Sequence, residues 1–98
     1  MSSNWKTLAL KRLARALLSF KNEDDLLKFL RDLCSLDELK ELGTRWEIAQ
    51  LLAHGESYRA VAKKTGVSTT TVTRIAWWLE HGEGGYRTAL KKIAKKLT

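Results

Sequence analysis

A run of hydroxyl side chains followed by an arginine occupies residues 68–74. A helix that begins here would point five of these side chains outward: Ser68, Thr69, Thr70, Thr73 and Arg74. Short hydroxyls let another backbone approach closely and hydrogen-bond to several kinds of base edge, whereas arginine suits guanine. Capping of a helix start is the ordinary alternative use of such hydroxyls. The pattern favours a surface that reads nucleic acid.

The elements that would position this surface lie between Ser57 and Glu80. We expect two short helices joined by a tight turn at Thr65-Gly66-Val67, in which Gly66 adopts a left-handed conformation and Ser68 caps the second helix. The second helix then buries one apolar stripe at helical spacing, formed by Val72, Ile75, Ala76 and Leu79. The first helix offers Val61 and Ala62 as a small apolar face, which allows a close crossing. The stretch therefore predicts a helix-turn-helix, although a purely structural corner between two helices would share the pattern.

The start of the first helix of this motif would lie near the phosphates, while the start of the second would enter the major groove. The predicted DNA-contacting residues are Ser57, Tyr58, Arg59, Ser68, Thr69, Thr70, Thr71, Thr73 and Arg74. The sequence leaves open whether a later group of lysines, Lys91, Lys92, Lys95 and Lys96, adds further attraction or only keeps the chain soluble.

The net charge of +7 is unevenly distributed along the 98 residues. Residues 1–21 carry five Lys or Arg and no acid, residues 22–56 carry four against nine acids, and residues 57–98 carry nine against two. Positive charge that coincides with a predicted helix-turn-helix is typical of a protein that binds a polyphosphate. No apolar run approaches the length of a membrane span and no signal-peptide pattern precedes the first charges, so a cytoplasmic protein is the default expectation.

The rest of the chain predicts further helices, in keeping with the absence of proline. We expect helices over Asn4–Ser19, from Asn22 as N-cap to about residue 33, from a Ser35–Glu38 capping box to about His54, and over Tyr86–Leu97. Gly43 lies inside the third of these helices, where it either breaks the helix or marks a close approach of another helix, and we favour the close approach. The last helix should turn Leu90, Ile93, Ala94 and Leu97 inward. We expect His81–Tyr86 to form a hinge between the second helix of the helix-turn-helix and this last helix.

No catalytic constellation is evident, so the sequence favours a binding protein over an enzyme. His54 and His81 each stand beside a glycine expected to end a helix, where an imidazole commonly bonds the last carbonyls. Cys34 is the single cysteine, which excludes an internal disulfide and a cysteine-based zinc site, and we expect it in the core. No cofactor or metal site is expected.

Several short stretches resemble the Trp repressor superfamily, in particular a little-characterised bacterial branch of Trp-repressor-like proteins. The residues that carry the resemblance are Leu42-Gly43-Thr44-Arg45, Leu51-Leu52, Gly55-Glu56, Val72-Thr73-Arg74, Phe29–Cys34 and Trp78–Tyr86. The resemblance covers about residues 17–90. It implies an all-α fold of six helices, with residues 1–98 as one DNA-binding domain, the helix-turn-helix at about 57–80 and N-terminal dimerisation helices at about 4–33. It also implies an intertwined homodimer that binds an operator through paired recognition helices.

The resemblance also points to a co-repressor pocket, formed here by Arg45, Arg74, Ile75 and Trp78. In the family two arginines sandwich the indole of tryptophan, and they match Arg45 and Arg74. Ile75 stands where the family pattern has a glycine, and Trp78 stands where it has a serine. We expect Trp78, with or without Trp77, to fill the pocket, so that tryptophan is not the co-repressor. The expected function is a sequence-specific regulator of transcription, most simply a repressor. Two alternatives stay open: a regulator that answers another ligand in a remodelled pocket, and a protein–protein adaptor that has kept only the fold.

Overall fold

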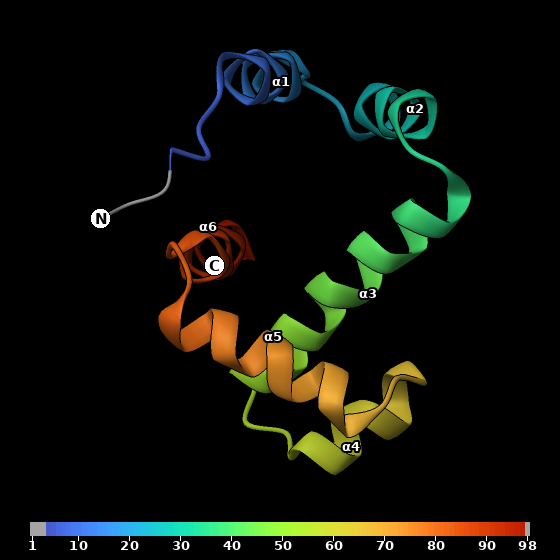
Figure 1. Cartoon of the computed structure of the whole chain (residues 1–98), viewed down its shortest axis with the longest axis vertical. Helices are drawn as coiled ribbons and strands as arrows, with labels where there is room; N and C mark the ends of the chain where they lie inside the picture. The colour runs from blue at the N-terminus through green and yellow to red at the C-terminus, as the bar shows by residue number, and fades with distance from the viewer. Residues whose placement is uncertain (1–3, 98) are drawn as a thin grey trace. The chain divides into compact units, whose positions relative to one another are not determined.

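The computed structural model describes residues 4–97, with side chains as far as Lys95, so the predictions for the Lys96 and Leu97 side chains lie outside the described residues. Six α-helices and no strand occur in the described part of the chain, which confirms the all-α fold class (Figure 1). The helices are α1 Leu8–Ser19, α2 Glu23–Leu33, α3 Leu36–Ala53, α4 Tyr58–Thr65, α5 Thr69–His81 and α6 Gly85–Leu97. The chain forms two compact units that divide between Leu39 and Lys40. One domain over residues 1–98 stays a prediction.

The first unit contains α1 and α2. The prediction that the first helix begins at Asn4 was wrong, because Thr7 has extended dihedral angles and its Oγ1 accepts a hydrogen bond from the Leu10 N–H at 3.2 Å, so the helix begins after it. Asn22 caps α2 as predicted, accepting from the Asp25 N–H at 2.9 Å. The rings of Phe20 and Phe29 lie 5.2 Å apart. Neither helix buries a residue within the chain.

The core lies in the second unit, among residues of α3, α4 and α5. Its buried residues are Ile48, Ala49, Val61, Val72 and Ile75. Partly buried side chains of α3, α5 and α6 pack around them, including Trp46, Leu52, Leu79 and Tyr86. The predicted apolar stripe of α5 therefore faces the core as expected, since Val72 and Ile75 are buried while Ala76 and Leu79 are half-buried.

The ends of α3 are formed by the predicted residues. The Ser35 N–H donates to Glu38 Oε1 at 2.8 Å and the Glu38 N–H donates to Ser35 Oγ at 3.1 Å, which is a reciprocal capping box. The bond from the Ser35 backbone, assisted by the Ser35 side chain, lowers the pKa of Glu38 below its ordinary value. Gly55 follows the helix with a φ of +87°.

Gly43 does not interrupt α3, and no close approach occurs at it within the described chain. A Cβ built on Gly43 would meet nothing within 4 Å outside its own helix backbone. The predicted close approach is therefore wrong for a single chain, because the helices that pack on α3 do so nearer its C-terminal half, around Ile48 and Ala49.

α6 is held against α3 and α5 at its N-terminal end. Arg87 Nε donates to the Leu79 carbonyl at 2.9 Å and its guanidinium lies 3.2 Å from Glu80 Oε2. The rings of Tyr86 and Trp46 stack with centroids 6.4 Å apart. The predicted inward face of α6 is wrong beyond Leu90, because Ile93 is 41% exposed and Ala94 is exposed. Among its described side chains, α6 is partly buried at Tyr86, Ala89 and Leu90, in its N-terminal half.

Candidate nucleic-acid interface

The helix-turn-helix is set up by local hydrogen bonds at each of its ends. Ser57 Oγ accepts from the Ala60 N–H at 3.1 Å at the start of α4. Gly66 ends α4 with a φ of 77°, and its N–H donates to the Ala62 carbonyl at 2.9 Å. Ser68 Oγ then accepts from the Thr71 N–H at 3.2 Å, two residues after the turn glycine. These caps fix where α4 ends and α5 begins, so the predicted motif is present.

The predicted DNA-contacting residues lie at the N-terminal ends of α4 and α5, on the surface. Exposed members are Ser57, Tyr58, Arg59, Ser68, Thr69, Thr70, Thr73 and Arg74, whereas Thr71 is half-buried. The start of α5 is thus free for an approaching ligand along most of its first two turns. That these residues contact DNA stays a prediction.

The hydroxyl groups at the start of α5 are not equivalent. Ser68 Oγ and Thr71 Oγ1 lie 3.2 Å apart and share the N-cap, while Thr73 Oγ1 donates to the Thr69 carbonyl at 2.9 Å. No hydrogen bond to another described residue engages the hydroxyls of Thr69 and Thr70. Only these two hydroxyls are therefore wholly available to a partner.

The charges around the motif are positive and partly unpaired. Lys64 is neutralised by Glu56, whose carboxylate oxygens lie 2.6 and 2.7 Å from Nζ. Arg59, Lys63 and Arg74, in contrast, form no ion pair with any residue that the structure describes. The first turns of α4 and α5 contain no acidic residue, so the positive end of each helix dipole is uncompensated. This surface suits a polyanion.

The predicted effector-pocket residues have separate environments. Ile75 is 5% exposed and belongs to the core, Trp78 is 53% exposed, and Arg45 pairs with Glu41 at 2.6 Å. A cavity of about 310 Å³ does lie in the second unit, but none of these residues nor Arg74 lines it. Its lining residues are Leu52, Ala53, Gly55, Glu56, Tyr58, Ala76, Leu79, Glu80 and Arg87.

The C-terminal end of α5 carries an aromatic cluster, and a glycine follows it. The Trp77 ring lies 5.0 Å from both the Trp78 and the His81 rings. A Cβ on Gly82 would approach the Trp78 carbonyl oxygen to 2.5 Å, so no larger residue fits there without movement. From the sequence, Gly82 was expected only as part of a hinge. Its close contact with the carbonyl of Trp78, four residues earlier, leaves no signature in the amino-acid composition.

The histidines and the cysteine have structural environments. His54 Nδ1 lies 2.8 Å from the Gln50 carbonyl, as predicted for an imidazole at a helix end. His81 instead contacts the Trp77 ring, and Cys34 is half-buried at the C-cap of α2 rather than in the core. No group of three or more His, Cys, Asp or Glu side chains among the described residues could hold a metal ion. No described helix has the length and apolarity needed to cross a membrane.

Comparison with known proteins agrees with the resemblance seen in the sequence. The family model described as Trp repressor protein matches residues 8–94, which is most of the chain. This chain belongs to the Trp repressor family. It is 33% identical over 89 residues to the uncharacterised protein YerC of Bacillus subtilis, covering 91% of this chain and 86% of YerC.

Solved structures of this Trp repressor family show the same fold. A TrpR-like protein from Eubacterium eligens matches with a TM-score of 0.85 at 35% identity, over 91% of this chain and 92% of that one. A protein described as a putative Trp repressor from Staphylococcus aureus matches with a TM-score of 0.87 at 27% identity, over 95% of this chain and 96% of that one. The Trp repressor family is one of DNA-binding regulators, and membership indicates that general class of function rather than an enzyme.

Proposed function

We propose that this chain is a cytoplasmic, sequence-specific regulator of transcription that binds double-stranded DNA as a homodimer and acts as a repressor. The observation that carries the proposal is the start of α5. Its first turn has exposed hydroxyls and no acidic residue, and Arg74 in the next turn forms no ion pair with a described residue. Membership of a family of DNA-binding regulators supports the same function. We propose neither a cofactor nor catalysis.

The mechanism places α5 in the major groove. Thr69, Thr70 and Arg74 then meet base edges, while Ser57, Tyr58 and Arg59 at the start of α4 contact phosphates and fix the register. Two such helices in a symmetric dimer would contact half-sites about 34 Å apart, which is one turn of the duplex. The exposed Lys91 and Lys92 of α6 add sequence-independent attraction only if that helix faces the duplex.

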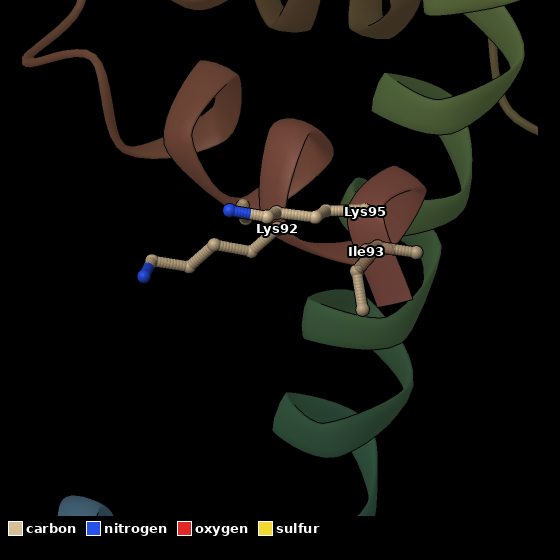
Figure 2. A pocket seen from close by; sticks show the side chains of 4 residues that line it. Lys92, Ile93 and Lys95 are labelled. Carbon is tan, nitrogen blue, oxygen red and sulfur yellow. The ribbon is translucent and has the colours of Figure 1, made fainter. Parts of the chain in front are cut away.

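The homodimer is supported by apolar side chains that a single chain leaves uncovered. In α1 the exposed apolar side chains include Leu8, Leu10 and Leu18, and Leu18 is 84% exposed. Beside α6 lies a hollow of about 650 Å³ whose described lining comes from this helix alone and includes Lys92, Ile93 and Lys95 (Figure 2). Exposed apolar surfaces of this kind commonly mark interaction sites, and a second copy of the chain would cover them.

We further propose that the regulator acts without tryptophan as co-repressor. Two departures from the family pattern support this: Ile75, which replaces a glycine, belongs to the core, and Trp78, which is 53% exposed, replaces a serine. Calorimetric titration of tryptophan into the purified dimer is expected to give no heat of binding at micromolar concentrations. A measurable micromolar affinity would contradict this part of the proposal.

A regulator that answers a different ligand is the second candidate, and the cavity of about 310 Å³ favours it. The cavity is large enough for a small metabolite and is lined by residues of α3, α4, α5 and α6 or the turns between them. A thermal shift with a panel of metabolites would separate this function from a ligand-free repressor, because a ligand that binds the folded state raises the melting temperature.

The deciding experiment is selection of the purified protein on a random duplex library at two salt concentrations, followed by sequencing. An enriched pseudo-palindrome with half-sites about one turn apart would support the proposal. Salt-sensitive binding without enrichment would instead indicate non-specific coating or a missing effector. Dimerisation with no DNA binding at either salt would favour the adaptor.

A further inference from the structure

The hydrogen bond of Thr73 decides which part of its side chain faces outward. Thr73 Oγ1 donates to the Thr69 carbonyl at 2.9 Å, one turn back along the same helix. The substituents of Cβ are staggered, so the methyl group Cγ2 takes a position away from that carbonyl. Because the Thr73 side chain is exposed, an approaching surface meets this methyl group rather than an available hydroxyl donor.

The neighbours of Thr73 on the same face offer different chemistry. Thr70 lies one turn earlier, is exposed, and its hydroxyl has no hydrogen-bond partner in the described part of the chain. Arg74 follows at four residues from Thr70 and carries a guanidinium without an ion pair to a described residue. The face thus presents a hydroxyl, a methyl and a guanidinium in a fixed order.

We propose that Thr73 determines sequence specificity by placing its methyl group against the 5-methyl group of a thymine in the major groove. This inference rests on the proposed DNA-binding function and specifies one of its contacts. The 5-methyl group is the only apolar group that the major-groove edges of the four base pairs present, and a threonine methyl is a suitable partner for it. Thr70 and Arg74 then read the hydrogen-bonding edges on either side.

The test uses the operator obtained by library selection and removes single methyl groups from it. Each thymine is replaced in turn by deoxyuridine, which lacks only the 5-methyl group, and the affinity is measured at constant salt. For the unsubstituted protein we expect one thymine per half-site whose replacement weakens binding about fourfold, as for loss of one buried methyl-sized group.

Two variants separate the methyl group of Thr73 from its hydroxyl. Thr73→Val keeps the methyl and should bind the thymine operator as the original chain does. Thr73→Ser keeps the hydroxyl, should bind about fourfold more weakly per half-site, and should lose nothing more when the critical thymine becomes deoxyuridine. Melting temperatures of both variants establish that each is folded before its affinity is compared.

Two results would overturn the inference while leaving the proposed function intact. One is an enriched operator in which no thymine methyl matters to the original chain. The other is a variant result that assigns the contact to another group. Either a Thr73→Ser variant that retains the full effect of deoxyuridine or a Thr73→Val variant with the low affinity expected of Thr73→Ser would be such a result. Absence of DNA binding at either salt concentration would instead remove the proposed function itself, and this inference with it.

Discussion

At the scale of single residues, we propose that the side chains that start α4 and α5 divide into readers of bases and binders of phosphate. Thr70 has an available hydroxyl on the outer face of α5, whereas Arg59 presents a charge near the start of α4 without an ion pair to any described residue. A long cation attracts every phosphate about equally, while a short hydroxyl bonds only where a base edge offers a partner. Their substitutions should therefore have different signatures.

We expect Arg59→Ala to weaken binding to all duplexes about equally. It should also flatten the dependence of the logarithm of affinity on the logarithm of salt concentration by about one unit for each bound protomer. Thr70→Ala should instead reduce discrimination between the operator and a scrambled duplex and leave the salt dependence unchanged. Fluorescence anisotropy over a salt series measures both. Lys28→Ala on α2 is a matched control for loss of charge, and an unchanged slope in Arg59→Ala would argue against a phosphate contact.

At the scale of the helices, boundaries follow from capping side chains and from glycines. Ser35, Ser57 and Ser68 each accept a hydrogen bond from a backbone N–H three residues later, and Gly55 and Gly66 follow helix ends with positive φ. Such contacts involve residues within one turn of each other. For this reason the starts of α2, α3, α4 and α5 could be predicted from the sequence alone. The start of α1 was placed too early, because the apolar pattern includes Trp5 and the cap residue Thr7 was overlooked.

The capping box of α3 makes a small part of the stability depend on pH. The folded-state pKa of Glu38 lies below its ordinary value of 4.5, so the ionised carboxylate stabilises the folded state. This contribution is complete above pH 4.5 and is lost as the pH falls through the lowered folded-state pKa. Titration followed by NMR should show the pKa of Glu38 rise part of the way toward its ordinary value in Ser35→Ala, because alanine removes the side-chain hydrogen bond and keeps the backbone N–H that is the larger cause. A pKa that does not move would mean that the Ser35 side chain contributes nothing and that the backbone N–H of this residue, which alanine retains, is the whole cause.

Gly43 and Gly82 form a contrasting pair for substitution by alanine. In the single chain Gly43→Ala fills open space in the interior of α3, so we expect it to stabilise the fold by about 0.5–1 kcal/mol. Gly82→Ala should destabilise it by more than about 1 kcal/mol, because the new methyl collides with the Trp78 carbonyl. Chemical denaturation at one protein concentration measures both. A destabilised Gly43→Ala would show that another copy of the chain approaches α3 there.

At the scale of the whole molecule, the buried core is small and confined to the unit that carries the helix-turn-helix. The five buried residues of the described chain all belong to α3, α4 and α5, while α1 and α2 bury none. The apolar face of an amphipathic helix normally packs against another protein surface. The exposed leucines of α1 and the exposed Ile93 of α6 therefore support the proposed homodimer.

We expect the purified protein to sediment as a dimer and Leu18→Glu to shift it toward the monomer. Leu18 is 84% exposed within one chain, and a glutamate placed in an interface would lose its hydration. Ser19→Glu adds the same charge at the next position and should leave the dimer intact. Sedimentation velocity over a range of concentrations measures both variants. A Leu18→Glu variant as dimeric as the original chain would place the interface elsewhere.

The sequence by itself determined the local features of this protein: its helical class, most helix caps, the turn at Gly66 and the outward position of the hydroxyls that follow Ser68. These features depend on residues no more than about four positions apart. Tertiary structure decided which apolar faces are covered. It assigned Ile75 to the core, left Ile93 exposed, anchored α6 through Arg87 on α5, and left Gly43 without a contact from another described element of the single chain. Such outcomes depend on packing between segments far apart in the chain. An apolar stripe predicts that a helix face is buried, but it does not indicate which other surface buries it.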